Sequence, residues 1–414
     1  GRVLEEPEYI HESVDWIRDL IQTRFFADGM WMEGAVSYHN QIVYGLASIL
    51  ELLEGYSDPE GYKHPKTGQR FENLDLEAQY PLLQKALGIA DRFRYPNGRT
   101  ISVHDTWARE RREPLTKSDS HLSPAAGHAW LGKGEGDRQI QAHLHFSGAY
   151  GHAHSDLLSI TLFSHGQERL SDIGYTWTKH RQWASSTLSH STVMVNGKDQ
   201  SKTGSPPVEG DLRMFLTVDP DFQVLEASGA RAYPGIVKEY RRTLILVGTP
   251  DGDAYLVDLF RVKGGDRHEY VLVGDANHDG EIRTDLAVRS FGETLLPPGV
   301  DVTLPSGETV PGHASDGHNF YYAYVSSVVT ADPTASYKAT IHSEGKPTGA
   351  VRVHGLTGSE GDLLIARAPS VRQAEESEGR LADYSMPTMI YRREGSNLTT
   401  AYLNVLEPHG ESPF

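Results

Sequence analysis

The sequence predicts an α+β protein in two parts, a helical region over residues 1–116 and a large antiparallel β-sandwich over residues 117–414. Three observations lead to this fold class. The length of 414 residues exceeds what one ordinary core holds. Apolar residues recur at helical spacing in the first part, whereas the second part consists of short alternating runs between Gly, Pro and Asp turns. Strands that follow one another without helical spacers are expected to pair antiparallel.

The helical region shows three amphipathic stretches. They contain Val14, Ile17, Leu20 and Ile21, then residues 42–53, then residues 82–93. Three or four helices do not readily enclose a core by themselves. We therefore expect them to belong to a larger helical array or to pack against another layer. Residues 28–41, D-G-M-W-M-E-G-A-V-S-Y-H-N-Q, lie between the first two stretches. Their polar and aromatic side chains indicate either a packed loop at a helix start or part of a site.

The sandwich is expected to begin after a linker at residues 117–126. Its clearest predicted strands are residues 139–146, 242–247, 254–262, 269–273, 321–329 and 363–368. Residues 275–286 begin like a calcium loop, but Leu286 stands where such a loop carries a bidentate Glu, and the flanks are strand-like. We therefore favour a turn over a Ca²⁺ site there.

The composition excludes several classes of protein. A formal net charge of −17 argues against nucleic-acid binding, which needs a basic footprint, and no apolar run reaches the length of a membrane span. The absence of cysteine excludes disulfides and thiolate ligands, so any metal must be held by His, Asp or Glu. The chain opens on Gly1 without a signal peptide, which indicates a processed chain or a fragment of a longer one.

A polyanionic substrate would need a local basic cleft in this acidic chain. Arginines that could supply it are Arg92, Arg94, Arg99, Arg109, Arg111 and Arg112. The alternative is that these arginines are solvated surface charges.

The candidate site lies in residues 147–200. The apolar residues of 158–162 alternate with Ser and Thr, as in a half-buried strand. His152, His154 and Asp156 share the parity of those apolar residues, so a strand that extended back would carry them on one face. The sequence predicts a turn at residues 165–167 and an antiparallel return over residues 168–173.

The return strand would bring Asp172 back toward the histidines. His190 precedes a third predicted strand, residues 191–195, which Asn196-Gly197 closes with a hairpin-turn signal. His154, Asp172 and His190 thus become possible neighbours. Two imidazoles and a carboxylate with one open position form a ligand set typical of zinc. The alternative is that these histidines cap strands or hydrogen-bond in a polar rim, since no short motif such as H-E-x-x-H is present.

The motifs resemble those of the heparinase II/III-like superfamily of polysaccharide lyases. The resemblance spans roughly residues 28 to 270 and rests on G-H-A-H-S-D-L-L-S-I (151–160), D-I-G-Y (172–175), W-A-S-S-T-L-S-H-S-T-V-M-V-N-G-K-D-Q (183–200), Y-R-R-T-L-I-L-V (240–247) and the strand-like run at 255–270. Upstream, E-G-A-V-S-Y-H (33–39) is similar to the segment that carries the family's catalytic tyrosine. Ser191 stands where the family usually has Asn.

The resemblance implies an incomplete N-terminal (α/α) toroid, here residues 1–116, followed by the sandwich. It assigns His154, Asp172 and His190 as metal ligands, usually for Zn²⁺, and Tyr38 and His152 as catalytic residues. Tyr175 is a weaker candidate for a second catalytic tyrosine. Residues predicted to bind substrate are Glu33, His39, Arg94 and Arg181.

The implied reaction is β-elimination in a uronate-containing polysaccharide, either alginate or a glycosaminoglycan. A base removes the C5 proton, the 4-O-glycosidic bond breaks, and the product carries a 4,5-unsaturated uronate. The substrate carboxylate must be neutralised to stabilise the enolate-like state. A tyrosine can act as the base and then protonate the leaving oxygen. We expect Tyr38 to be this base. His152 is then the base for the opposite epimer, or a partner of the tyrosine or of the substrate carboxylate.

One departure concerns the family's carboxylate-neutralising Asn or His, which precedes the tyrosine. Only 37 residues precede Tyr38, none is Asn, and His11 is the sole histidine among them. Either the first toroid helices lie outside this chain, or the neutralising group is supplied differently. We favour the former, with the missing helices in a longer precursor or a second polypeptide. Association of this chain into a homo-oligomer is also possible on this reading.

Two alternatives belong to other functional classes. One is a carbohydrate-binding or surface protein that has kept the sandwich and lost catalysis. The other is a metal-dependent hydrolase in which the metal activates water. A secreted or periplasmic location is implied by the family and the polymeric substrate alone.

Overall fold

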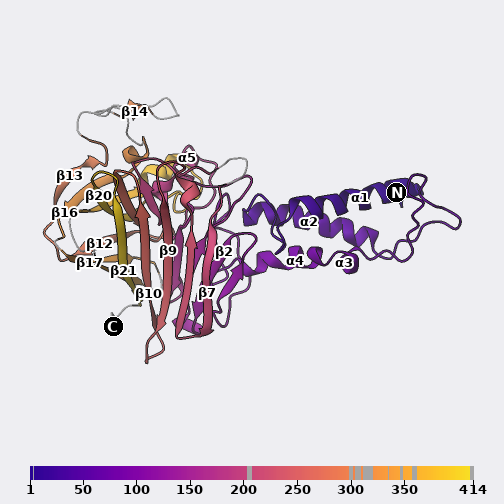
Figure 1. The fold of residues 1–414 in the computed structure, drawn as a ribbon, viewed down its shortest axis with the longest axis horizontal. Coiled ribbons are helices and arrows are strands. Elements are labelled where there is room, and N and C mark those ends of the chain that lie inside the picture. Colours follow the sequence, from indigo (N-terminus) through magenta and orange to yellow (C-terminus); the bar gives the residue numbers. More distant parts are fainter. Residues whose placement is uncertain are drawn as a thin grey trace.

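The computed structural model describes residues 1–2, 4–202, 208–297, 302–303, 309–310, 320–333, 335–345, 348–356 and 361–410. Helices form an arm that projects from one edge of a large β structure (Figure 1). The predicted fold class, N-terminal helices followed by large antiparallel sheets, is confirmed. Among the described residues, no helix combines the length and apolarity needed to cross a bilayer.

The arm consists of two long helices and shorter elements beneath them. These elements are α1 (Pro7–Arg24), α2 (Val36–Leu53), α3 (Leu76–Gln79), α4 (Pro81–Ile89) and the 3-10 turn η1 (Ala90–Arg92). Ile10, Val14, Ile17 and Ile21 recur on one face of α1 and pack against the buried face of α2. Full burial of such a side chain stabilises the fold by about 1.5–3 kcal/mol, so this face holds the two helices together.

Within the described residues, the β structure has three main sheets, all antiparallel. The first sheet, in spatial order, contains β1 (His121–Ser123), β2 (His128–Lys133), β3 (Ile140–His145), β4 (Ile160–Ser164) and β5 (Gln167–Leu170). The second contains β12 (Gly280–Thr284), β17 (Ser336–Ser343), β18 (Gly349–Leu356), β21 (Thr399–His409), β10 (Ala254–Lys263), β9 (Glu239–Gly248), β8 (Phe222–Ser228) and β7 (Asp211–Asp219).

The third sheet contains β13 (Arg289–Thr294), β16 (Ser326–Ala331), β19 (Asp362–Pro369), β20 (Ser385–Glu394), β11 (Arg267–Val273) and β6 (Val193–Val195). A two-stranded ribbon pairs β14 (Val302–Thr303) with β15 (Thr309–Val310). The short helical elements of this region are η2 (Gly136–Arg138), α5 (Arg181–Ala184), η3 (Thr187–Ser189), η4 (Ala230–Ala232), η5 (Phe320–Tyr324) and η6 (Glu378–Asp383).

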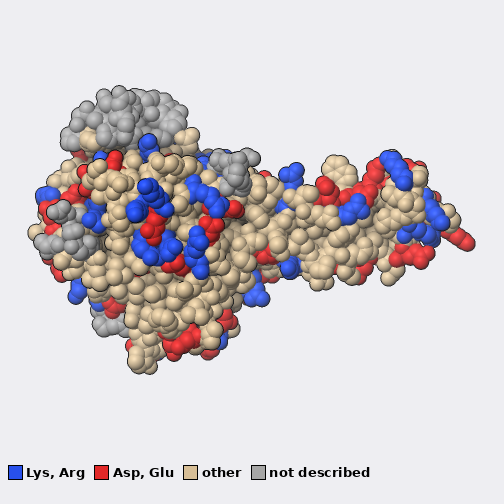
Figure 2. Space-filling model, viewed as in Figure 1, with Lys and Arg blue, Asp and Glu red and all other residues tan. Residues whose placement is uncertain are grey.

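The main core lies between the sheets. Apolar residues of β2 to β4, among them Leu131, Leu144 and Leu162, form one cluster with residues of the second sheet such as Leu244 and Leu256. The outer face of the second sheet is charged and solvated. Figure 2 shows Lys and Arg side chains mixed with Asp and Glu over the strands β7 to β10, where Arg241 and Arg261 pair with Glu226. Apolar and charged residues alternate along these strands, so the second sheet has an apolar inner face and a charged outer face.

A smaller cluster joins the arm to the sandwich. It includes Val36 at the start of α2, Phe93 and Val103 from the connecting segment, and Trp130 and Phe163 from β2 and β4. This cluster lies on the face of the first sheet opposite the main core. It fixes the N-terminus of α2 against the sandwich and so sets the position of Tyr38.

Three local predictions require correction. The strand predicted over residues 321–329 begins only at Ser326, because η5 occupies Phe320–Tyr324. The strand of His154 does not extend back from residue 158: β4 begins at Ile160, and positive φ angles at His152 (52°) and Leu158 (61°) are incompatible with an extended strand. Strand β6 pairs with β11, so the third predicted strand belongs to a different sheet from β4 and β5.

Candidate active site

A short loop between the arm and the sandwich brings the parts of the site together. The Thr106 hydroxyl accepts a hydrogen bond from the Val36 amide at the start of α2 (2.9 Å), and its carbonyl accepts one from the Tyr175 amide (3.0 Å). The Asp105 amide donates to the carbonyl of His152 (3.0 Å). These three bonds hold the α2 N-terminus and two sandwich loops against one segment.

Two buried histidines face each other in this region. His154 Nδ1 lies 3.3 Å from His190 Nε2. His154 Nε2 donates to Asp105 Oδ1 (3.1 Å), and His190 Nδ1 donates to the carbonyl of Ser186 (2.7 Å). Because the outer nitrogen of each ring is engaged by its acceptor, the two inner nitrogens face the same point, where a proton or a metal can lie between them. Such acceptors on the outer nitrogens are the usual support of metal-bound histidines.

Two carboxylates complete the surroundings of His190. Asp172 Oδ1 lies 3.4 Å and Asp156 Oδ2 3.7 Å from His190 Nε2. Burial disfavours the charged imidazolium, but Asp172 and Asp156 outweigh it and raise the pKa of His190 to about 9. Burial also opposes ionisation of Asp156, yet His145 and His190 hold its pKa well below the ordinary value. A buried site with this excess of negative charge favours a cation.

The residues present fit a metal ion. One ligand atom each from His154, Asp156 and His190 lies within 4.8 Å of the others, and all three side chains are buried. Among the described residues, His145 Nε2 approaches Asp156 Oδ2 to 3.0 Å without good hydrogen-bond geometry, and Oδ1 has no hydrogen-bond partner. Buried carboxylates are rarely left unbonded, so this one has the free acceptor capacity that a cation requires. This His-Asp-His group can therefore bind a metal.

A layer of four further histidines lies behind Asp156. His145 Nε2 is 3.0 Å from Asp156 Oδ2, and His104 Nδ1 is 3.9 Å from Asp156 Oδ1. His128 pairs with His145 across β2 and β3, and its Nδ1 lies 3.3 Å from His143 Nε2. Burial lowers the pKa of His104 to about 4 and of His143 to about 3, and it holds the pKa of His128 well below its ordinary value. These three histidines are therefore neutral.

Tyr38 and His152 form a stacked pair beside the metal group. Their ring centroids are 3.6 Å apart with planes inclined by 16°. His152 Nδ1 donates to Asp105 Oδ2 (2.9 Å), which leaves Nε2 as the free nitrogen of the ring. Tyr38 lies in the first turn of α2 and is half-buried. The tyrosine and histidine predicted from the sequence as catalytic residues are thus in direct contact.

Asp105 connects this pair to the metal group. Its carboxylate accepts from His152, His154 and Arg181 Nη2 (3.1 Å). Burial opposes its ionisation, but the hydrogen bonds from His154 and His152 and the charge of Arg181 lower its pKa to about 2. Asp105 is therefore a permanently charged anchor for three side chains of the site.

Tyr175 and Arg181 line the other side of the stacked pair. The Tyr175 ring lies 6.5 Å from that of Tyr38, edge to face, and the Arg181 guanidinium carbon lies 4.9 Å from the Tyr175 ring centre. Burial raises the pKa of Tyr175 to about 12, against the opposing charge of Arg181. Tyr175 is therefore a protonated hydrogen-bond donor at neutral pH.

The other residues predicted to bind substrate have different surroundings. Glu33 lies near the pair, with Oε2 3.9 Å from His152 Nε2, and accepts from the Trp31 indole (2.8 Å). His39 does not fit its predicted role, because it is buried and both ring nitrogens are engaged, with the Trp31 amide (3.0 Å) and the Ala86 carbonyl (2.9 Å). Burial lowers its pKa to about 4.

Arg94 lines a separate cavity of about 360 Å³ with His121 and Trp130. Its guanidinium donates to the Glu113 carbonyl (2.8 Å). None of the residues that surround Tyr38 or the metal group lines that cavity, so the structure does not bring Arg94 to the site.

The metal group thus combines predicted and unpredicted residues. His154 and His190 meet as the sequence indicated, although His154 lies on a loop and His190 precedes a strand of another sheet. Asp172 contacts His190 and also accepts from the Gly174 amide (2.8 Å), and its role as a ligand stays a prediction. Asp156 was noted for its parity but not assigned as a ligand.

Asp105 and the histidine layer were not predicted from the sequence. Asp105 lies in S-V-H-D-T-W (102–107), a connecting segment without regular spacing, so no pattern marks it. The alternation H-L-H at 143–145 within a strand was the available signal for the layer, because residues two apart share a face.

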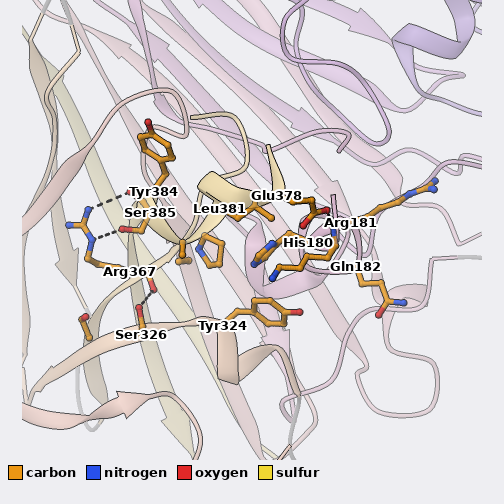
Figure 3. A pocket seen from close by; sticks show the side chains of 15 residues that line it. His180, Arg181, Gln182, Tyr324, Ser326, Arg367, Glu378, Leu381, Tyr384 and Ser385 are labelled. Atoms are coloured by element: carbon orange, nitrogen blue, oxygen red, sulfur yellow. Dashed lines mark hydrogen bonds between the residues drawn. The ribbon is translucent and has the colours of Figure 1, made fainter. Parts of the chain in front are cut away.

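A cavity of about 720 Å³ adjoins the site next to α5. Figure 3 shows Tyr324, Leu381 and Tyr384 along it, with Arg367 bonded to Ser385 at one end. Arg181 lies at the other end and extends away from the remaining labelled side chains (Figure 3). Its guanidinium instead reaches Asp105, so this cavity neighbours the site without containing the metal group or the stacked pair.

Comparisons with known proteins agree with the geometry. Residues 115–283 match the family described as heparinase II/III-like, C-terminal. An alginate lyase of Stenotrophomonas maltophilia is 28% identical over 140 residues, which cover 30% of this chain and 18% of the relative. An exo-oligoalginate lyase of Saccharophagus degradans is 28% identical over 137 residues, which cover 29% of this chain and 18% of the relative. The matches thus span less than a fifth of each relative.

A solved structure resembles nearly the whole chain. The heparan sulfate lyase HepC from Pedobacter heparinus superposes with a TM-score of 0.63, covering 99% of this chain and 57% of that protein at 13% identity. At so low an identity the likeness concerns the fold. Residues 115–283 are thus similar to the heparinase II/III-like C-terminal family, and the chain shares its fold with a heparan sulfate lyase.

Proposed function

We propose that this protein is a polysaccharide lyase that cleaves uronate-containing chains by β-elimination. The observation that carries the proposal is the stacked pair of Tyr38 and His152, held by Asp105 beside a buried His-Asp-His group. The pair supplies a base and an acid at one place. Arg181 next to it supplies a positive charge for the substrate carboxylate.

The reaction needs a proton removed from C5 and a proton given to the leaving oxygen. The C5–H and C4–O bonds break, a double bond forms between C4 and C5, and the leaving chain takes up a proton. Tyr38 serves as the base, because its ring lies in the first turn of α2, stacked on that of His152. The phenol thus formed then protonates the leaving oxygen from the same side.

His152 and Tyr175 assist this step. Asp105 holds the Nδ1 proton of His152, so that the free Nε2 is available to the substrate as an acceptor or as the base for the opposite epimer. Tyr175 stays protonated and can donate a hydrogen bond to the Tyr38 phenolate or to the substrate. Arg181 keeps part of its guanidinium exposed, with 48% of the side chain accessible, and can neutralise the C5 carboxylate.

The metal is proposed to be Zn²⁺, held by His154 and His190 with Asp156, Asp172 or both. Imidazole and carboxylate donors without a thiolate suit this ion. When bound, the ion supplies a fixed positive charge that holds the loops of His154 and His190 together. His152 lies two residues before His154, so the position of His152 depends on the same loop.

Alginate is the first substrate to test, because the two curated relatives are named alginate lyase and exo-oligoalginate lyase. Heparan sulfate comes next, since the structural relative is a heparan sulfate lyase. Each polymer presents the uronate that the proposed chemistry requires.

The test is the ultraviolet absorbance of the unsaturated uronate, with alginate, heparan sulfate, chondroitin and hyaluronan offered separately. We expect a rise with one polymer that Tyr38→Phe lowers by about 10²–10⁴-fold, the usual contribution of a general base. A rise that Tyr38→Phe leaves unchanged would refute the assignment of the base. Saturated products would indicate a hydrolase instead.

A further inference from the structure

Three aromatic side chains pack together next to the stacked pair and form a platform, in which Trp177 is exposed, Trp107 half-buried and Tyr175 buried. The Tyr175 ring centre lies 4.8 Å from that of Trp107 and 5.0 Å from that of Trp177, both near perpendicular. Trp107 and Trp177 are 6.3 Å apart. Trp177 is 69% exposed. Large apolar side chains grouped at a surface usually mark a binding site, whereas single ones need no explanation.

Two arginines border this platform of Trp107, Tyr175 and Trp177. The Arg109 guanidinium carbon lies 4.1 Å from the Trp107 ring centre, and that of Arg181 lies 4.9 Å from the Tyr175 ring centre. Arg109 is exposed, and no carboxylate pairs with it in the part of the chain that the structure describes. Guanidinium groups stacked on rings keep their edges free for a planar anion such as a carboxylate.

The backbone beneath the platform is firmly held. The Thr176 hydroxyl and the Trp177 amide both donate to Glu376 Oε2 (2.7 and 2.8 Å). Gly174 has a φ of 71°, and a side chain there would meet the Thr106 carbonyl. The exposed ring of Trp177 is therefore carried on a fixed segment, which lowers the entropic cost of binding a ligand.

Two glutamates, Glu375 and Glu376, also lie near the platform, and both are already engaged. Glu376 is engaged by Thr176 and Trp177, and Glu375 pairs with Arg380 (3.2 Å). A cavity of about 290 Å³, lined in part by Trp107, Arg109 and Tyr175, opens beside the rings. It has room for part of a sugar unit at the platform edge.

We propose that Trp107 and Trp177, with Arg109, form a subsite for a uronate residue adjacent to the one that reacts at Tyr38. The apolar face of a pyranose ring would stack on the indoles, and its carboxylate would bind the guanidinium of Arg109. Tyr175 links the two sugar positions, because its ring lies against Trp107 on one side and faces Tyr38 on the other. This inference rests on the proposed uronate-directed function and adds the residues that hold the neighbouring unit.

The test measures binding of an alginate tetrasaccharide by calorimetry in a Tyr38→Phe background, so that turnover does not interfere. We expect Trp107→Ala and Trp177→Ala each to weaken binding by about three- to tenfold, as for the loss of one aromatic contact. Trp16→Ala is the matched control, because Trp16 is 79% exposed on α1, and it should leave binding unchanged. Thermal unfolding of each variant checks that it folds like its parent.

Arg109→Gln tests the part of the subsite that is proposed to bind the carboxylate. It should weaken tetrasaccharide binding and reduce the dependence of binding on salt, because one charge contact is lost. The neutral cellotetraose serves as the second probe. We expect it to bind more weakly than the uronate chain and to be insensitive to Arg109→Gln.

The possible outcomes separate this inference from the proposed function. Tetrasaccharide binding that Trp177→Ala and Trp107→Ala affect no more than Trp16→Ala overturns the subsite but leaves the lyase intact. Sensitive binding without unsaturated product in the wild-type assay supports the subsite and refutes the lyase. A parent that binds no tetrasaccharide overturns both for this substrate class.

Discussion

His154 Nδ1 and His190 Nε2 point at each other across 3.3 Å, while the outer nitrogen of each ring donates to Asp105 or to the Ser186 carbonyl. Two lone pairs at this distance repel unless a proton or a metal lies between them. The arrangement is therefore matched to a cation, and it can be tested directly.

We predict that His190→Ala abolishes stoichiometric metal binding. The variant removes one of two imidazole donors, and the wild type should be stabilised against heat by added Zn²⁺ while the variant is not. Metal content after dialysis and the shift in Tm measure the effect. His354→Ala, a half-buried histidine of β18 that pairs with Glu407 at 2.9 Å, is the control. Equal metal content in both variants would contradict the site.

The carboxylates can be compared in the same assay. Asp172 Oδ1 lies 3.4 Å and Asp156 Oδ2 3.7 Å from His190 Nε2, so a metal bound to that nitrogen would be close to both carboxylates. We expect Asp156→Asn and Asp172→Asn each to lower metal affinity and the double variant to abolish it. If one single variant binds as tightly as the wild type, that residue is not a ligand.

Asp105→Asn should weaken both metal binding and turnover. The amide has no charge and only one acceptor oxygen for the three donors His152, His154 and Arg181. Loss of such a supporting group typically lowers metal affinity by about 10–100-fold. A metal titration beside the lyase assay measures both effects. Asp211→Asn, an exposed carboxylate paired with Arg231, should change neither, and an unaltered metal affinity in Asp105→Asn would remove its positioning role.

Tyr175→Phe should reduce turnover less than Tyr38→Phe does. Tyr175 is cast as a hydrogen-bond donor, and one such bond to a charged group contributes about 1.5–3 kcal/mol, or roughly 10–100-fold. Because its pKa is raised to about 12, Tyr175 does not titrate in the working range. The alkaline limb of the pH profile of kcat/KM should therefore be the same in Tyr175→Phe and wild type. A shifted limb would show that Tyr175 is itself the titrating group.

The helical arm is predicted to loosen in acid through Asp58. Its carboxylate accepts from His11 (2.9 Å), the Phe71 amide (2.7 Å) and the Tyr56 hydroxyl (2.9 Å). Burial raises its pKa, but these hydrogen bonds outweigh burial, and the net pKa is lowered. Since the folded pKa lies below the unfolded value of about 3.9, the stabilisation is present above that pH and is lost as the pH falls through the folded pKa.

Hydrogen exchange of the α1 amides, corrected for intrinsic rates, measures this loosening. Protection should fall below about pH 4 in the wild type. Asp58→Asn should be less protected at neutral pH and should lose most of the acid dependence. Asp15→Asn, a half-buried residue of α1 paired with Arg18, is the control. Unchanged protection down to the lowest pH would contradict the role of Asp58.

The sequence by itself determined the order of the architecture and most of the chemistry-bearing residues. Helical periodicity in the first part and alternation in the second reflect burial of one helix stripe or one sheet face, which is local information. The predicted helix at residues 42–53 falls within α2, and the predicted strand at 254–262 falls within β10. Motif resemblance brought together His152, His154 and His190 with Tyr38, from a segment far away along the chain.

Only the tertiary structure decided how these residues meet. Asp105 lies in an irregular segment whose polar groups bond to three separate parts of the chain, and no local pattern encodes such contacts. His39 follows Tyr38 directly, yet helix geometry turns it into the packing of the arm while Tyr38 faces His152. Asp156 likewise gained its place from the loop that replaced the predicted strand, because side-chain direction in a loop follows backbone contacts rather than a period.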